Sequence, residues 1–359
     1  MNKSRSKGSQ AKSIKQGEKS AKATRSSGKN PSTKSTDESQ QSSKISHGLQ
    51  QKCLNIFRDA LWTGPEDIAT LQEVKGHLYN RDFARAFGSE PYLRAYALRW
   101  SAARALGYMQ VFEDVDRFIA EQSRDAPSGE PSRVLAIGGG AGAELVSIAG
   151  WQHLVEDVER DETRSRPVEA SLVDLAAWQP ISAKLGDAVV SLPPVSKYAS
   201  AAVREANTPL VSKDRFNAIC EQADVLEWSE TTVSERMRTT DLVTIMFTLN
   251  ELYSTSVPKT QRLLKYLTTS MRSSALLLVV DSPGSYSTVS LNGAEKKYPM
   301  QWLLDHTLLG SRPEDAVWEK VLTNESKWFR LPDGLDYPVD LENMRYQIHL
   351  YRRRSSEFV

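Results

Sequence analysis

Cysteine is scarce in this chain, since Cys53 and Cys220 are the only two among 359 residues and neither belongs to a CxxC pair. Two thiols cannot build a disulfide framework or a four-thiolate zinc site, so a reducing compartment is expected. The five histidines are scattered, without a paired ligand spacing such as HxxxH. No metal site is therefore predicted.

Long apolar runs are also missing. No run reaches the roughly 18 to 20 residues that a bilayer-spanning helix needs, and the first residues lack the apolar core of a signal peptide. We expect an intracellular, soluble protein with no membrane contact. The sequence leaves the oligomeric state open.

Aliphatic residues are nearly absent from residues 1–46, which are rich in Ser, Lys, Gly, Gln and Thr. Such a segment cannot bury enough surface to offset its chain entropy, so a disordered tail is predicted. Residues 1–50 carry a net charge of +8, which leaves −7 for the rest of the chain. A basic tail suits polyanion binding or nuclear import, and a purely solubilising tail is the alternative.

The chain beyond the tail divides into two parts. Between Leu54 and Gln122, apolar residues recur at spacings of three and four, which indicates several helices. A loop rich in Pro and Gly, Asp125 to Ser132, comes next. Short apolar runs then alternate with helical stretches, the pattern of a parallel α/β sheet. We predict a tail at 1–46, a helical region at 47–125 and an α/β domain at 126–359.

Seven strands are expected in the α/β domain, and the last two should form a hairpin at the sheet edge. Their predicted ranges are Arg133–Ile137, Val168–Asp174, Phe216–Cys220, Asp241–Phe247, Ala275–Asp281, Lys327–Leu331 and Met344–Tyr351.

The first strand runs into a glycine-rich loop that contains Gly138, Gly139, Gly140 and Gly142. Glycine lets the backbone turn tightly beside a ligand, and the helix after the loop offers unpaired N–H groups to an anion. The anion could be the methionine carboxylate of S-adenosylmethionine (SAM) or a pyrophosphate, because the loop also satisfies the loose dinucleotide fingerprint.

Two acids come after the next strands. Asp174 closes the second strand, where a carboxylate binds ribose hydroxyls, but it comes 36 positions after Gly138, later than the roughly 20 of a dinucleotide enzyme. Asp224 comes after the third strand and is a candidate contact for the adenine amine. Asp174 could instead be a surface acid, and Asp224 could instead cap a helix.

The fourth strand leads into Asn250, Glu251 and Tyr253 at the carboxyl edge of the sheet, where open α/β folds bind ligands. We expect the chemistry there. Alternatively, Asn250 and Glu251 cap the next helix. Asp281, after the fifth strand, could line the same crevice or simply anchor its turn.

The helical region interleaves aromatic residues with arginines. Arginine can bind phosphate while aromatic faces stack unpaired bases, so an RNA-binding role is predicted for part of this segment. The alternative is that the aromatics pack in the core and the arginines are merely solvated. The candidate RNA contacts are Arg81, Arg85, Arg99, Trp100 and Arg104.

Four motifs together resemble the fungal 25S ribosomal RNA (uridine-N3) methyltransferases: Leu78-Tyr-Asn-Arg-Asp-Phe, Arg99-Trp-Ser, Ile137-Gly-Gly-Gly-Ala-Gly-Ala-Glu144 and Thr248-Leu-Asn-Glu-Leu-Tyr253. The resemblance spans Leu54 to Arg353. It implies a class I SAM-dependent methyltransferase fold, a mostly parallel sheet with an antiparallel edge strand, and methylation of a uridine N3. It further implies ribosomal RNA or a preribosomal particle as partner, in the nucleus (nucleolus) and also in the cytoplasm.

The chain departs from the common class I pattern at Ala136, where many of these enzymes carry an acid that binds the amino group of SAM. Glu144, at the start of the next helix, is a possible substitute. For the chemistry, Glu251 is the candidate base, Asn250 the candidate hydrogen-bond partner of a uracil carbonyl, and Tyr253 a group that stacks or donates.

Other functions remain open. A ribosome-assembly scaffold without catalysis would explain Ala136, and the same fold could methylate a small molecule or a protein. A dinucleotide oxidoreductase is less favoured because Asp174 comes so late.

Overall fold

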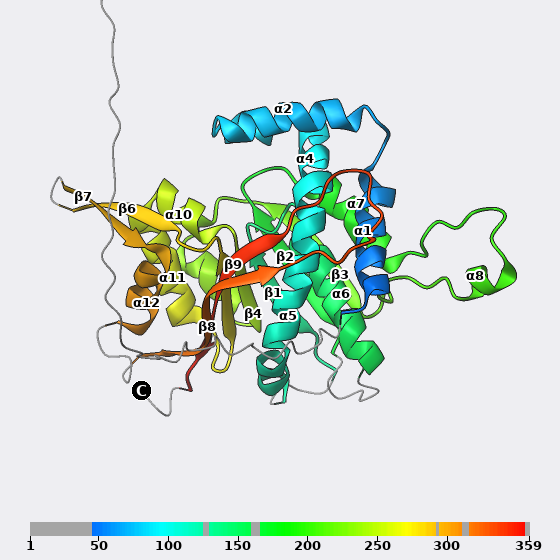
Figure 1. Ribbon diagram of the computed structural model, residues 1–359. Helices are drawn as coiled ribbons and strands as arrows, with labels where there is room; N and C mark the ends of the chain where they lie inside the picture. Colours follow the sequence, from blue (N-terminus) through cyan, green and yellow to red (C-terminus); the bar gives the residue numbers. More distant parts are fainter. Residues whose placement is uncertain (1–44, 125–128, 159–165, 292–293, 311–315, 356–359) are drawn as a thin grey trace, which may run out of the picture. The chain divides into compact units, whose positions relative to one another are not determined.

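The structure is a computed structural model that describes residues 45–124, 129–158, 166–291, 294–310 and 316–355 (Figure 1). The predicted basic tail lies outside the described residues, except for its last two positions. The described residues belong to one unit, Ser43–Val359. The domain boundaries drawn from the sequence stay a prediction.

Seven strands form one sheet in the order β3-β2-β1-β4-β5-β9-β8. β1 to β5 are parallel to one another, whereas β9 is antiparallel to both β5 and β8. This confirms the predicted fold class of a mostly parallel sheet with an antiparallel strand near one edge. The strands are β1 (Ser132–Ile137), β2 (Val168–Asp174), β3 (Phe216–Gln222), β4 (Leu242–Met246), β5 (Leu276–Asp281), β8 (Trp318–Phe329) and β9 (Met344–Arg353).

The central strands are buried on both faces, as their near-continuous apolar sequences require. Every residue of β4 and of β5 is buried. The strand order reverses between β1 and β4, and such a switch point opens a crevice at the carboxyl ends of the strands.

The five parallel strands and β9 lie within two residues of their predicted ranges, and the hairpin of β8 and β9 at the edge is confirmed. The predicted range Lys327–Leu331 is wrong, because β8 begins at Trp318. Two register shifts, at Lys320/Leu322 and at Asn324/Lys327, break the alternation of apolar and polar residues there. The small antiparallel pair β6 (Tyr286–Leu291) and β7 (Ala294–Pro299) was not predicted.

Helices cover both faces of the sheet. The helices predicted between Leu54 and Gln122 are present, and the first begins after Ser46, whose Oγ accepts a hydrogen bond from the Leu49 N–H. The helical elements are α1 (His47–Leu61), α2 (Asp67–Tyr79), α3 (Phe83–Ala86), α4 (Glu90–Tyr96), a π-helical turn η1 (Ala97–Ser101), α5 (Ala102–Ser123), α6 (Ala143–Val158), α7 (Gln179–Val190), α8 (Ala201–Glu205), a 3-10 turn η2 (Val225–Glu227), α9 (Glu230–Met237), α10 (Leu249–Thr255), α11 (Val257–Ser270) and α12 (Met300–Leu309).

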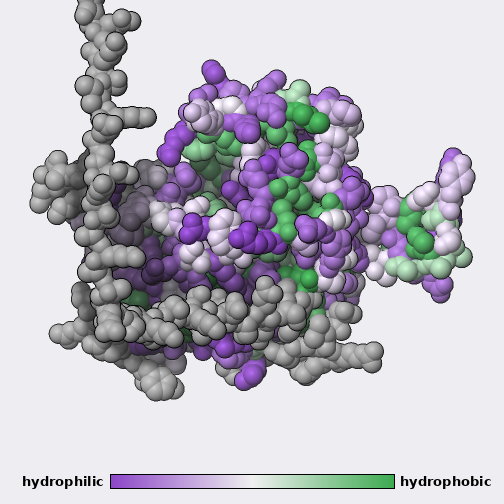
Figure 2. Space-filling model, in the orientation of Figure 1, coloured by the Kyte–Doolittle hydropathy of each residue, from purple (hydrophilic) through white to green (hydrophobic). Residues whose placement is uncertain are grey.

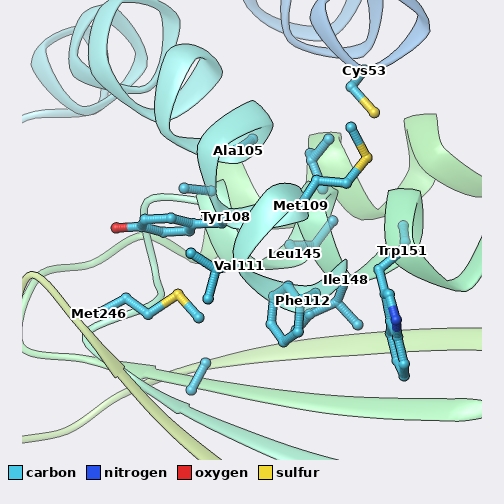
Figure 3. Close-up of a cluster of buried hydrophobic side chains, with 14 of the residues drawn as sticks. Cys53, Ala105, Tyr108, Met109, Val111, Phe112, Leu145, Ile148, Trp151 and Met246 are labelled. Carbon is cyan, nitrogen blue, oxygen red and sulfur yellow. The ribbon is translucent and has the colours of Figure 1, made fainter. Parts of the chain in front are cut away.

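Two apolar cores result, one on each face. Residues of α1, α5, α6 and α7 pack on one face of the sheet, and residues of α9 to α12 pack on the other. Figure 3 shows part of the first core, where Met109 and Phe112 of α5 meet Leu145 and Ile148 of α6. The long helix α5 therefore joins the amino-terminal helices to the sheet.

The segment around α8 projects from the rest of this unit (Figure 1). It carries exposed apolar side chains, among them Leu192, Tyr198 and Val203. Figure 2 shows hydrophobic residues gathered on this projection.

Candidate active site

The glycine loop after β1 is packed so tightly that side chains do not fit. Gly138 and Gly142 adopt φ angles of 80° and 86°, in the left-handed region. A Cβ on Gly138 would overlap the side chain of Thr248 from the loop after β4, and one on Gly140 would lie 2.5 Å from Trp178 Cδ1. Glycine is therefore required by both conformation and space.

Asp174, at the end of β2, is hydrogen-bonded to this loop, and its predicted contact with ribose stays a prediction. Its carboxylate accepts hydrogen bonds from the Gly140 N–H at 3.2 Å and the Ala176 N–H at 3.1 Å. Burial raises the pKa of Asp174, against the opposing effect of its hydrogen bonds. The acid therefore positions the glycine loop at the carboxyl end of β2.

Glu144 is buried beside the loop. Its side chain projects from the first turn of α6 and is only 3% exposed, and its Cδ lies 3.4 Å from the position of a Cβ on Gly139. Its Oε1 has no hydrogen-bond partner. Burial raises the pKa of Glu144 to about 8. A buried acceptor without a partner is costly, so this carboxyl group fits a ligand that brings a cationic donor.

Arg104 of α5 lies at this site and not on the surface. It donates a hydrogen bond to Tyr96 Oη at 2.9 Å, and its guanidinium lies 5.0 Å from the centre of the Phe247 ring. Burial lowers the pKa of Arg104, but neighbouring Tyr96, Tyr108 and Glu144 outweigh that effect and keep it charged. Arg104 is half-buried against the loop after β4, and its predicted contact with RNA stays a prediction.

Phe247 and Tyr108 were not predicted as parts of the site. Phe247 directly follows β4 and has a φ angle of 54°, a strained conformation for a bulky residue and one that is common at functional sites. Its ring stacks on Tyr108 with 6.1 Å between the ring centres. Figure 3 shows that the Tyr108 hydroxyl points away from Met109 and Trp151 in the core.

Tyr108 is 1% exposed, and burial raises its pKa well above the ordinary value, with further contributions from the charges of Glu144 and Asp281. Sequence offered one signal for it, its place at the end of the aromatic and arginine-rich segment.

A cluster of aromatic rings joins the amino-terminal helices to the loop. Trp178 is 5.6 Å from both Phe87 and Tyr96, measured between ring centres, and Tyr96 is 5.1 Å from Trp100. Trp100 is half-buried and packs against the Tyr96 ring, as the alternative of core packing expects. Trp178, against Gly140, had no signal in the sequence.

Only two of the predicted RNA contacts are solvent-exposed arginines. Arg81 is exposed, and the Arg85 side chain is 75% exposed with Asp82 as its ion-pair partner. Arg99 is 13% exposed and pairs with Glu342 at 2.5 Å. This carboxylate lies on the loop between β8 and β9, and the predicted contact of Arg99 with RNA stays a prediction.

The loop after β4 brings Asn250 to the carboxyl end of β5. The backbone N–H of Asn250 donates to Asp281 Oδ2 at 3.1 Å, and the side-chain Oδ1 of Asn250 is buried without a partner. Asp281 is 4% exposed, and burial raises its pKa. The acid that serves as a cap for α10 is therefore Asp281, which leaves the side chain of Asn250 available to a ligand.

Glu251 and Tyr253 lie on different sides of α10. Glu251 is exposed in the first turn, near enough to Asp281 that its charge raises the pKa of that acid. Tyr253 is 1% exposed and packs in the core beneath the sheet, where the Thr307 side chain is its neighbour. The prediction that Tyr253 contacts substrate is wrong, because the helix turns it into this core.

Asp224 is exposed at the carboxyl end of β3, and its Oδ1 accepts a hydrogen bond from the Leu226 N–H at 2.9 Å. The capping alternative is thus observed. Among the described residues there is no cluster of three or more His, Cys, Asp or Glu residues that could hold a metal ion. No described helix is both long enough and apolar enough to cross a bilayer.

Comparison with known proteins shows the family of the chain. A family model of SAM-dependent methyltransferases matches residues 59–352. A relative that is 32% identical over 295 residues, 78% of this chain and 76% of its own length, is the 25S rRNA (uridine(2843)-N(3))-methyltransferase of Saccharomyces cerevisiae. The chain belongs to this family of SAM-dependent methyltransferases, which confirms the resemblance seen in its motifs and identifies SAM as its cofactor.

Solved structures are more distant. A SAM-dependent methyltransferase of Methanosarcina mazei is 10% identical with a TM-score of 0.37, over 63% of this chain and 93% of that chain. An N-methyltransferase of Bradyrhizobium japonicum, solved with S-adenosyl-L-homocysteine (SAH), is 11% identical with a TM-score of 0.36, over 80% of this chain and 99% of that chain.

Proposed function

We propose that this protein transfers the methyl group of SAM to N3 of a uridine in large-subunit (25S) ribosomal RNA. The observation that carries the proposal is the pairing of a glycine loop and a buried, unpartnered Glu144 at one end of the crevice with Asn250 and Glu251 at the other. The yeast relative, whose name gives this reaction, supports the choice of substrate.

The cofactor end of the crevice has a group for each part of SAM. The backbone of Gly138, Gly139, Gly140 and Gly142 lets the ligand approach closely, Asp174 faces the ribose hydroxyls, and the exposed Asp224 faces the adenine. Glu144 receives the amino group. The unpartnered Oε1 of Glu144 supports this role. Glu144 would thereby replace the acid that many class I enzymes carry at the position of Ala136.

Arg104 completes this end of the crevice. It carries a buried positive charge beside Glu144, yet its guanidinium is hydrogen-bonded only to the neutral hydroxyl of Tyr96 among the described residues. An amino acid moiety carries one positive and one negative group side by side. We assign Glu144 to the ammonium and Arg104 to the carboxylate of the methionine moiety of SAM.

The substrate end supplies a base and a hydrogen-bond partner. SAM, when bound, supplies an electrophilic methyl group. Uridine N3 must lose its proton as it attacks, and the exposed carboxylate of Glu251 takes that proton. The Asn250 side chain hydrogen-bonds the uracil edge and keeps the base in line, since positioning supplies much of the rate enhancement. Its buried Oδ1 without a partner supports this role.

The partner implied by this function is ribosomal RNA or a preribosomal particle, met in the nucleus (nucleolus) or the cytoplasm. Arg81 and Arg85 remain the candidate RNA contacts of the amino-terminal helices, because they are exposed. A basic tail such as residues 1–46 adds attraction to phosphate that does not depend on sequence.

A scaffold without catalysis is the second candidate, favoured by Ala136 alone. Calorimetric titration of the purified protein with SAH separates the two functions. The proposed enzyme binds SAH, and incubation with SAM and unmethylated large-subunit RNA yields N3-methyluridine in nucleoside mass spectrometry. A protein that binds no SAH at millimolar concentration would be the scaffold. Binding of SAH without methylation of RNA would point to a small-molecule or protein substrate.

A further inference from the structure

An exposed tryptophan lies between two arginines on the edge hairpin. Trp328 of β8 is 49% exposed. The Arg330 guanidinium lies 5.0 Å from the centre of its ring, and that of Arg345 on β9 lies 5.7 Å away. We call these three residues the Trp328 patch. Neither the glycine loop nor the loop after β4 uses them.

The position of the patch relates it to the substrate end of the crevice. Arg345 pairs with Trp328 across the hairpin, and Gln347, two residues further along β9, pairs with Asp281. Residues two apart on a strand share a face and are separated by roughly 6.6 Å. The Gln347 side chain on that face donates to the Ser282 carbonyl at 2.7 Å. The Trp328 patch therefore borders the end of β5, where Asp281 supports Asn250.

The charges of the patch are not neutralised by nearby acids. Neither Arg330 nor Arg345 forms an ion pair with a carboxylate in the described part of the chain, and Arg345 hydrogen-bonds only the Ser326 hydroxyl. Two acids of this region are engaged elsewhere, because Glu342 pairs with Arg99 and Asp114 pairs with Lys327. In Figure 2 the surface over β8 and β9 is mainly hydrophilic.

A second exposed tryptophan, Trp302, has no arginine beside its ring among the described residues. Trp302 on α12 is 47% exposed, but its neighbours are the rings of Tyr298 at 4.8 Å and His306 at 5.1 Å, with no arginine among them. Its exposure is therefore similar to that of Trp328, while its surroundings lack the positive charge.

We propose that the Trp328 patch binds an unpaired nucleotide of the RNA next to the target uridine. Single-stranded RNA is held by aromatic faces that stack on bases and by arginines that bind phosphate or extend the stack. Trp328 offers the aromatic surface, and Arg330 and Arg345 offer the charges. The inference rests on the proposed function in one respect, namely that the substrate is RNA.

Fluorescence anisotropy with a labelled, single-stranded RNA 12-mer with a central uridine tests the patch. Stacking of one base is worth about 1–3 kcal/mol, so Trp328→Ala should weaken RNA binding by about 5- to 150-fold. Trp328→Phe keeps a stacking ring and should restore most of the affinity. Trp302→Ala is the matched control and should bind like wild type. SAH affinity should be unchanged in all three variants.

Salt dependence gives a second readout. Removing one phosphate contact with Arg345→Gln should reduce the slope of log affinity against log salt by about 0.7, as expected for single strands. Wild-type RNA affinity in Trp328→Ala, or an equal loss in Trp302→Ala, would overturn the patch while leaving the proposed function intact. A wild-type protein that binds SAH but no RNA would overturn the RNA substrate as well.

Discussion

Replacing Arg104 with methionine should weaken the binding of SAH and leave the binding of 5′-methylthioadenosine unchanged, because the second ligand lacks the amino acid moiety. Methionine keeps most of the aliphatic volume and removes the charge together with the hydrogen bond to Tyr96 and the guanidinium contact with Phe247. A hydrogen bond to a charged group contributes about 1.5–3 kcal/mol, and truncating one partner of a buried charged pair costs about 2–5 kcal/mol. We therefore expect about 2–4 kcal/mol, which is about a 30- to 1,000-fold higher Kd for SAH.

Isothermal titration calorimetry with both ligands measures this directly, and Arg85→Met serves as the control, because Arg85 lies in the same helical region but is exposed. Thermal unfolding without ligand reports whether the loss of the Tyr96 hydrogen bond and the Phe247 contact destabilises the fold. Equal weakening of SAH and 5′-methylthioadenosine would show a general distortion of the site. SAH binding as in wild type would refute the assignment of Arg104 to the methionine carboxylate.

Three further predictions concern the acids and the loop. Glu251→Gln should lower the rate of methyl transfer by about 10²- to 10⁴-fold with SAH affinity intact, and single-turnover assays at near-wild-type rate would remove Glu251 as the base. Burial raises the pKa of Glu144 to about 8, so its carboxyl group is neutral below that pH. The group must release its proton to bind an ammonium group, and SAM affinity should therefore rise between pH 6 and 8. Titration across this range should show a flat profile for Glu144→Gln, and a rising profile in that variant would contradict the assignment. Gly138→Ala should lower thermal stability by about 1–3 kcal/mol and abolish SAH binding, because a Cβ would overlap Thr248 at a φ angle of 80°; an SAH complex of normal affinity would contradict the close packing.

Much of the sheet could be predicted because its strands are simple. β4 and β5 are apolar along their whole length and are bounded by polar turns, so their ranges follow from composition. β8 differs because its exposed middle and its two register shifts remove the alternation on which such a prediction depends.

Part of the candidate site was predictable because it lies at the ends of the strands. Asp174 and the glycine loop meet because the ends of neighbouring parallel strands meet, which topology alone dictates. Residues on helices were harder to place. Glu251 and Tyr253 are two positions apart, so about 200° of helix rotation separates them, and one is exposed while the other is buried.

The arginines of the amino-terminal helices show most clearly what could not be predicted from the sequence. Arg85 and Arg104 share a basic, aromatic segment, yet one is open to solvent and the other is buried beside Glu144. Periodicity indicates which residues share a helix face, but not which face a distant loop will cover. Only the packing of α5 against the loop after β4 brings the Arg104 guanidinium to the Phe247 ring.

The most direct test of the central claim is nucleoside mapping of large-subunit ribosomal RNA by mass spectrometry after deletion of the gene. The proposed function predicts that N3-methyluridine disappears from one site, returns with the wild-type gene, and does not return with Glu251→Gln. Persistence of all N3-methyluridine in the deletion strain would contradict it.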